Sequence, residues 1–235
     1  MKQSEIKILS LDTSSEACSV ALLINGNTFE SHIVEPKAHT QILIPMINKI
    51  IQNAGVTLSD LDVIVLGNGP GSFIGMRIGA SVAQGLAFGL DLKIVPISSL
   101  TAIAFESFLI SKLKRVLVAQ EAKMGEVYLA EYIKGPKGWP KIVGEIQLKK
   151  ITEPANINSD DLFDAAGLGW QLNSDLLLNY KKYINKKLDI FYPRAKFLLS
   201  LGYQGWLDNL AIRPEQLIPN YVRQKVAKKP LKKNT

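Results

Sequence analysis

The chain has few of the side chains that bind metals or form disulfides. Its 235 residues include one cysteine, Cys18, and two histidines, His32 and His39. A single cysteine excludes a disulfide framework within the chain. The two histidines form no pair at helical spacing, which argues against a metal hydrolase, and neither lies near a nucleophile-elbow pattern. We therefore expect no metal site, no cofactor and no independent hydrolytic activity.

Neither a signal peptide nor a membrane-spanning helix is expected from the sequence. Met1–Lys7 carries lysines and a glutamate where a signal peptide needs an apolar core, so we expect a cytoplasmic protein. The apolar stretch Ile74–Leu90 is interrupted by Arg77 and Gln84 and is not flanked by the charges of a transmembrane helix. No contact with a membrane is expected.

Acidic residues are absent from the end of the chain. Arg223 and five lysines there account for all but one unit of the formal net charge of +7. The lysines are Lys225, Lys228, Lys229, Lys232 and Lys233. The rest of the chain is nearly neutral, so any electrostatic attraction to RNA is expected in a basic tail, residues 221–235. A solvated end without a partner is the alternative interpretation.

A glycine-rich turn between a strand and a helix organises the first half. The buried run Asp62–Leu66 is followed by three glycines within Gly67–Gly71 and by Ser72, which can cap a helix over Phe73–Gly89. Such a turn is expected to direct unpaired amide N–H groups at the space above the strand ends. Together with the helix N-terminus, those groups would favour an anion such as phosphate, and a relic or a packing device is the alternative interpretation of the turn.

Known phosphate-binding fingerprints fit this turn only in part. Gly69, Gly71 and Gly75 approximate a dinucleotide fingerprint, but the next strand ends at Pro96–Ser98 without an acidic residue for a ribose. A P-loop needs Gly-Lys-Ser/Thr, which is missing here. The polar turn Asp12–Glu16 is a second candidate for Mg-phosphate, although Asp and Ser are also common turn formers.

Hydrophobic periodicity predicts an α/β protein with two similar halves. The expected strands of the first half are Ile6–Leu11, Ala17–Ile24, Thr28–Val34, Asp62–Leu66 and Lys93–Ile97, and its helices are Thr40–Asn53, Phe73–Gly89 and Ser98–Leu113.

From Arg115 the strand, turn, strand pattern restarts, which indicates duplicated domains. The later elements are expected to be strands Val116–Gln120 and Val127–Ile133 around a turn at Glu121–Gly125, a loop over 135–140, a short apolar run Leu162–Ala166 and a last helix Ala195–Leu210. We expect a first domain over 1–113, a second over 114–220 and the basic tail.

Several motifs together resemble the bacterial TsaB (YeaZ) family. They are Ile8-Leu-Ser-Leu-Asp-Thr-Ser-Ser-Glu-Ala-Cys-Ser-Val20, His39-Thr-Gln41, Gly69-Pro-Gly-Ser-Phe-Ile-Gly-Met-Arg-Ile-Gly79, Gln84-Gly-Leu-Ala-Phe-Gly89 and Met124-Gly-Glu-Val-Tyr128. Looser matches at Tyr192-Pro193 and Pro219-Asn-Tyr-Val-Arg223 follow in the same order. The resemblance implies the two-domain actin/sugar-kinase/Hsp70 (ASKHA) fold, built from duplicated β-β-β-α-β-α domains.

The resemblance also implies a function. TsaB-like proteins are non-catalytic subunits of the machinery that makes N6-threonylcarbamoyladenosine at position 37 of tRNAs reading codons that begin with A. The expected partners are a TsaD-type catalytic subunit, a TsaE-type ATPase in the same complex, tRNA through the complex, and a second copy when the chain is alone. An independent nucleotide-dependent enzyme of the same fold and an RNA-binding module are the alternatives.

Two departures qualify the resemblance. The catalytic paralogue carries a His-x-x-x-His metal pair where this chain has Ser99 and Ile103, and isoleucine cannot bind a metal. A common Asp-Ala-Arg of the family is Glu121-Ala122-Lys123 here, so the role of those two charges is open. The phosphate loops are expected to be vestigial, at Asp12, Thr13, Ser14, Gly69 and Gly71. On that basis Asp12→Ala should cost only about 1 kcal/mol or less.

The partner surface is expected on the helices Thr40–Asn53 and Phe73–Gly89. Both are more apolar or richer in glycine than one internal contact requires. The expected interface residues are His39, Ile42, Met46, Lys49, Ile50, Phe73, Met76, Arg77 and Ala80. If Met46 or Met76 lies in the interface, its replacement by Asp should abolish binding without changing the melting temperature.

Overall fold

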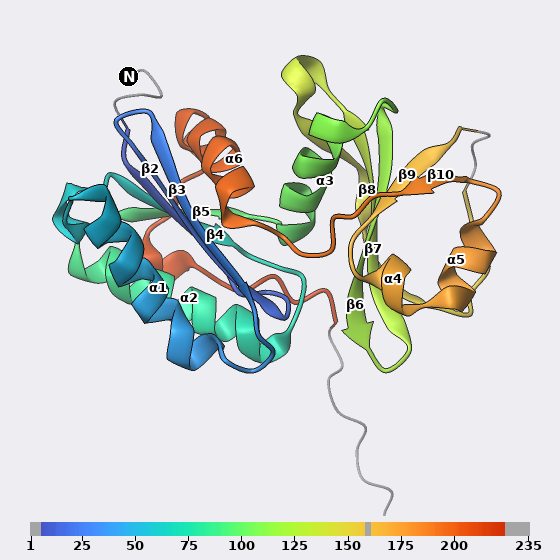
Figure 1. Cartoon of the computed structure of the whole chain (residues 1–235), viewed down its shortest axis with the longest axis horizontal. Helices are drawn as coiled ribbons and strands as arrows, with labels where there is room; N and C mark the ends of the chain where they lie inside the picture. The colour runs from blue at the N-terminus through green and yellow to red at the C-terminus, as the bar shows by residue number, and fades with distance from the viewer. Residues whose placement is uncertain (1–5, 158–160, 224–235) are drawn as a thin grey trace, which may run out of the picture.

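The computed structural model describes residues 6–157 and 161–223. Within them the chain forms two five-stranded sheets, each with helices packed on its faces (Figure 1). No helix in this described part is long and apolar enough to cross a membrane.

The first sheet has the strand order β3-β2-β1-β4-β5. Its strands are β1 (Ile8–Asp12), β2 (Ala17–Ile24), β3 (Asn27–Val34), β4 (Val63–Gly67) and β5 (Lys93–Ile97). β1, β2 and β3 pair antiparallel, whereas β4 is parallel to both β1 and β5. Every residue of β1, β2 and β4 is buried, as expected for strands covered on both faces.

Helices cover the two faces of this sheet. α1 (His39–Ala54) and α2 (Phe73–Gly89) lie on one face, and α6 (Ala195–Leu207) lies on the other (Figure 1). Glycines let α6 approach closely, because a Cβ built on Gly202 would stand 2.2 Å from the Val65 side chain. α6 falls inside the predicted second domain of 114–220, yet it packs on the first sheet. The boundaries expected from the sequence therefore need this correction.

The second sheet repeats the pattern of the first, with the order β10-β9-β6-β7-β8. Its strands are β6 (Arg115–Lys123), β7 (Glu126–Lys134), β8 (Pro140–Lys150), β9 (Phe163–Ala166) and β10 (Ile184–Lys187). β6, β7 and β8 pair antiparallel, and β9 is parallel to β6 and β10. Strand for strand this is the pairing of the first sheet, so the predicted duplication is confirmed.

The second sheet is covered by α3 on one face. α3 (Ser99–Ile110) supplies Leu100, Ile103 and Phe108 to a core shared with β6 and β7. The short helices α4 (Gly169–Leu172) and α5 (Ser174–Tyr180) cover part of the opposite face. Three 3-10 turns complete the described elements: η1 (Leu58–Asp60), η2 (Pro136–Gly138) and η3 (Pro214–Gln216).

The structure departs from the predicted elements mainly in the second half. No strand was predicted at β8, because most of this outermost strand is exposed and only residues 145–149 alternate between polar and apolar side chains. β6 continues through the expected turn to Lys123, which leaves Met124 and Gly125 as the turn. α3 and α6 are also shorter than expected, ending at Ile110 and Leu207.

The glycines of α2 divide into two kinds. A Cβ on Gly75 would stand 2.1 Å from the backbone oxygen of Thr13, and one on Gly79 would stand 2.4 Å from its Oγ1. A Cβ on Gly85 or Gly89 would meet nothing within 4 Å. At Gly75, therefore, α2 lies directly against the backbone of the turn after β1.

We predict opposite effects of alanine at two of these glycines. Gly75→Ala should lower the free energy of unfolding by about 1 to 3 kcal/mol, because the backbone of Thr13 must move. Gly85→Ala, on the same helix, should raise it by up to about 1 kcal/mol through helix propensity. Denaturant unfolding of both variants checks this, and equal effects at the two positions would contradict it.

Candidate functional site

The polar turns predicted as phosphate loops meet at one end of the first sheet. The turn after β1, the turn after β4 and the first residues of α3 all lie at the carboxyl ends of parallel strands. In α/β sheets this edge is where ligands commonly bind. Asp12, the last residue of β1, stands at its centre with no solvent exposure.

The Asp12 carboxylate accepts hydrogen bonds from neighbouring turns. Ser99 Oγ donates to Oδ2 at 2.6 Å, while the backbone N and the Oγ of Ser14 donate to Oδ1 at 2.9 and 2.7 Å. The Gly69 N–H donates in turn to Ser99 Oγ at 3.0 Å. One connected network therefore links β1, the glycine-rich turn and the start of α3.

Backbone amides of the glycine-rich turn are bonded within the chain. Ser72 N donates to the Ser14 oxygen at 2.6 Å, and Gly75 N donates to Ser72 Oγ at 3.2 Å. The predicted cap at Ser72 is confirmed. The expectation that the turn directs unpaired N–H groups at an anion is wrong for Gly69, Ser72 and Gly75, because each of these amides already has a partner.

The glycines allow the two turns to touch. A Cβ on Gly67 would stand 1.8 Å from Asp12 Oδ2, and one on Gly71 would stand 2.0 Å from the Ser14 oxygen. Thr13 closes the contact from the other side, since its Oγ1 donates to the Gly75 oxygen at 2.7 Å. All five residues predicted as phosphate loops thus lie together, and they contact one another.

The positions of the paralogue's metal pair have other roles here. Ser99 bonds Asp12, while Ile103 is fully buried in the core between α3 and the second sheet. Among residues 6–157 and 161–223, no group of three or more His, Cys, Asp or Glu side chains is placed to hold a metal ion.

Burial controls the ionisation of Asp12. Desolvation raises the pKa of its carboxyl from 3.8 to about 6, although the hydrogen bonds from Ser99 and Ser14 act in the opposite direction. A carboxylate in this position loses hydration that its three donors only partly replace. The group is consequently protonated far more readily than an exposed aspartate.

The second half contributes charges opposite the first turn. Lys123, at the end of β6, pairs with Glu121 and lies 3.8 Å from Glu16 Oε1 in the turn after β1. The two residues whose role the sequence left open therefore form a small ion network that reaches across the two halves. Lys123 is largely exposed, so this network adds little stability.

A second candidate site lies on α1 and α2. A shallow depression of about 390 Å³ is lined by Thr40, Ile74, Arg77, Ile78, Ser81 and Val82. Ile74 is 69% exposed, and the Arg77 guanidinium lies 3.3 Å from the centre of the Phe73 ring. This depression is called the α1–α2 groove below.

The predicted interface residues divide between this surface and the core. Lys49, Phe73 and Arg77 are exposed and Ile42 is half-buried. The other five, His39, Met46, Ile50, Met76 and Ala80, are buried. His39 Nε2 lies 3.3 Å from the Ala17 oxygen, within the chain. Ile74 and Val82, which line the groove, were missed because their helical spacing resembles that of a core stripe.

The two methionines are a correction to the sequence prediction. Met46 and Met76 are each 4% exposed, and a Cβ on Gly69 would stand 2.2 Å from Met76 Sδ. Met46 belongs to the core between the first sheet and its helices, and Met76 lies against the turn at Gly69. An aspartate at either position would disrupt the core before it tested an interface. The exposed residues of the groove are the proper sites for that test.

Arg223 is also placed differently from its prediction as an RNA contact. Its guanidinium pairs with Glu126 at 2.6 Å and donates to the Ala122 oxygen at 2.8 Å. Only 15% of the side chain is exposed, so its charge is engaged inside the protein. Lys225, Lys228, Lys229, Lys232 and Lys233 lie outside the described residues.

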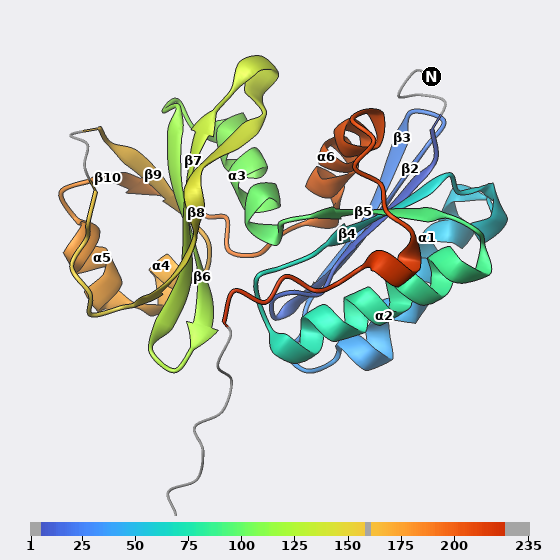
Figure 2. The ribbon, with the colours of Figure 1, turned by 180° about the vertical axis from the view of Figure 1, so that it is seen from behind.

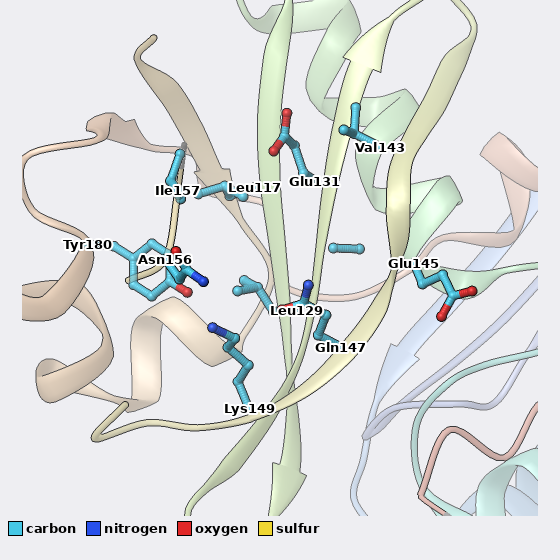
Figure 3. A pocket seen from close by; sticks show the side chains of 11 residues that line it. Leu117, Leu129, Glu131, Val143, Glu145, Gln147, Lys149, Asn156, Ile157 and Tyr180 are labelled. Atoms are coloured by element: carbon cyan, nitrogen blue, oxygen red, sulfur yellow. The ribbon is translucent and has the colours of Figure 1, made fainter. Parts of the chain in front are cut away.

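Another hollow lies on the second sheet, on the face that α5 partly covers (Figure 3). It holds about 80 Å³ between β7, β8 and the segment before β9. Its lining includes Leu129, Glu131, Val143, Gln147 and Tyr180. Glu131 is paired with Arg115, so its carboxylate is already engaged within the chain.

The Asp12 network yields a pH prediction. Because the pKa is higher in the folded protein, deprotonation of Asp12 opposes folding, and its contribution should fall by up to about 3 kcal/mol as the pH rises from 4 to 7. Asp12→Asn removes this titration. The difference in unfolding free energy, wild type minus variant, should therefore decline over that range, and a flat difference would contradict the raised pKa.

The same network revises the expected cost of Asp12→Ala. Alanine would leave the Ser99 hydroxyl and the Ser14 amide without their buried acceptor, and each unpaired buried donor costs about 1 to 3 kcal/mol. We expect a loss of about 2 to 4 kcal/mol in urea unfolding at pH 4, where deprotonation of Asp12 does not yet oppose folding. A measured loss below about 1 kcal/mol would instead support the smaller cost of Asp12→Ala that we expected from the sequence.

Comparison with known proteins agrees with these motifs. The sequence model of a family described as TsaD, tRNA N6-adenosine threonylcarbamoyltransferase, matches residues 32–177. The chain is 36% identical to the tRNA threonylcarbamoyladenosine biosynthesis protein TsaB of Haemophilus influenzae, covering 96% of this chain and 97% of the relative. The protein of the same name from Escherichia coli is 35% identical, with 96% and 98% covered.

A solved structure agrees as well. YeaZ from Pseudomonas aeruginosa superposes with a TM-score of 0.82 at 33% identity, covering 92% of this chain and all of that one. The likeness therefore extends over most of the chain. On this basis the chain belongs to the TsaB (YeaZ) family and has its two-domain ASKHA fold.

Proposed function

We propose that this chain is a non-catalytic, cytoplasmic subunit of the machinery that forms N6-threonylcarbamoyladenosine at position 37 of tRNAs reading codons that begin with A. Its role is to bind and activate a TsaD-type catalytic subunit through α1 and α2. The names of the relatives in Haemophilus influenzae and Escherichia coli place those proteins in this biosynthesis.

The observation that carries the non-catalytic role is the closed network at Asp12. In a nucleotide-dependent enzyme of this fold, the corresponding turns must offer free donors and a charged carboxylate to the bound phosphate and its cation. Here Ser99, Ser14 and Gly69 bond Asp12 or one another, so these donors are already engaged within the chain. These turns serve to fix the first residues of α2 and α3.

The α1–α2 groove supports the partner role. Single exposed apolar residues are ordinary, but a depression lined by Ile74, Ile78 and Val82 marks a surface suited to another protein. Arg77 and Lys49 add positive charge on the same two helices, which favours a partner with carboxylates at the rim. A contact across both helices would reach the usual 1,200–2,000 Å².

The same proposal covers the remaining partners. A TsaE-type ATPase would join through the complex with the catalytic subunit, and a second copy could occupy the groove when the chain is alone. Contact with tRNA would occur within the complex, with the five tail lysines as candidates. An independent nucleotide-dependent enzyme remains the alternative function, and an RNA-binding module is less favoured because Arg223 is already paired.

Calorimetry on the isolated chain separates the first two functions. We predict no ATP binding at micromolar concentrations, because Asp12 and its donors are already bonded to each other. Ser99→Gly, which opens the network at Oδ2, serves as the companion variant. Micromolar affinity of the unsubstituted chain for ATP would favour the enzyme.

The partner surface is tested with Ile74→Asp. An unpaired carboxylate inside an apolar contact costs several kcal/mol, so affinity for the catalytic subunit should fall by at least about 100-fold at an unchanged melting temperature. The control is Leu178→Asp on α5, where the leucine is similarly exposed. In cells depleted of this protein, the control should restore threonylcarbamoyladenosine in bulk tRNA and Ile74→Asp should not.

Two results would contradict the proposal. Normal levels of the modified nucleoside after depletion would remove this chain from the pathway. Equal affinity of Ile74→Asp and the unsubstituted chain for the catalytic subunit would place the interface elsewhere.

A further inference from the structure

The C-terminal segment 217–223 connects the two halves on the side opposite η2. Leu217 is buried in the core of the first sheet, and Val222 packs against the core between α3 and the second sheet. Between them, Asn68 Nδ2 donates to the Ile218 oxygen at 3.0 Å. Figure 2 shows this segment, in red, running past α2 to the lower end of β6.

Tyr221 lies beside α2 at the end of the helix where Phe73 and Arg77 are found. Its ring centre lies 5.7 Å from that of Phe73, and the Arg77 guanidinium lies 5.3 Å from the Tyr221 ring centre. Arg77 therefore contacts both aromatic rings while it also lines the α1–α2 groove. The surface of α2 thus continues without a break onto the C-terminal segment.

Arg223 connects the C-terminal segment to the second half of the chain. Besides Glu126 and the Ala122 oxygen, its guanidinium contacts Met124 Sδ at 3.3 Å. The turn at this point has three successive left-handed residues, Lys123, Met124 and Gly125, with φ of 61°, 59° and 71°. Left-handed backbone is unfavourable for Lys and Met, and here the bonds from Arg223 hold it in place.

The turn between β6 and β7 exposes an apolar side chain to solvent. Met124 is 76% exposed, and Ile218 on the adjoining segment is 73% exposed. Positive φ at Met124 and Gly125 is the geometry of a two-residue hairpin turn. An exposed methionine on such a turn suits a contact with a partner, because its side chain adapts its shape. The turn between β6 and β7 and the segment 217–223 both lie on the side of the molecule where the N-terminal end of α2 is found (Figures 1 and 2).

We propose that the surface for the TsaD-type subunit is composite and spans both halves of this chain, running from the α1–α2 groove over Phe73 and Tyr221 to Ile218 and Met124. It rests on the proposed function, because it names further contacts of the same partner. The partner then presents an apolar strip longer than two helices, with a carboxylate opposite Arg77. The motif Pro219–Arg223 has the role of joining the two parts of this surface.

The test measures affinity for the purified catalytic subunit with full-length chains. Met124→Asn keeps a residue that tolerates left-handed backbone, and Ile218→Asn alters the segment instead of the hairpin. Each should weaken binding by about tenfold, as expected when one apolar side chain no longer becomes buried. The matched control is Leu178→Asn, which should bind as the unsubstituted chain does.

The outcomes separate the two proposals. Loss of binding by Ile74→Asp, with full affinity of both asparagine variants, overturns the composite surface and leaves the proposed function standing. No binding by the unsubstituted chain overturns both. If Met124→Asn also lowers the melting temperature, the result for Ile218→Asn decides. Weakened binding by Ile218→Asn at an unchanged melting temperature supports the composite surface. Full affinity of Ile218→Asn refutes it.

Discussion

A buried carboxylate is the constraint on which the first half depends. Asp12 ends β1, and its bonds to Ser14 and Ser99 fix the turn after β1 against the start of α3. The glycines of the adjoining turn are required because Gly67 and Gly71 leave room only for hydrogen atoms beside Asp12 and Ser14. With that end of the sheet fixed, α2 begins at a defined place and offers its outer face as a surface. This end of the sheet therefore fixes the position of the face that α2 turns outward.

Much of this arrangement could be predicted from the sequence. Continuous apolar runs gave the fully buried strands β1, β2 and β4, and glycines with a capping serine gave the start of α2. The restart at Arg115 gave the duplication, since the strand pattern returns in the same order. These features are local, and local chemistry determines them. The turns around Asp12 were found for the same reason, because polar residues follow buried strands.

The remaining features depend on contacts between distant residues. The edge strand β8 is mostly exposed, its apolar alternation is confined to residues 145–149, and its full length follows only from its pairing with β7. Whether Met46 faces a core or a partner cannot be read from a broad apolar stripe, because both faces of α1 carry aliphatic side chains. The bonds from Ser99 to Asp12 and from Arg223 to Glu126 join residues 87 and 97 positions apart, so no spacing rule anticipates them.

The helix α6 comes late in the chain but packs on the first sheet, and this has a consequence for the order of folding. Ser10 Oγ, in β1, donates to the Ala195 oxygen, 185 residues later in the chain, and α6 covers a face of the sheet to which β1 belongs. During synthesis, that face stays open until the ribosome has released α6. Contacts of such long sequence separation slow folding and leave apolar surface accessible to chaperones in the meantime. The first strand made is thus among the last to be enclosed.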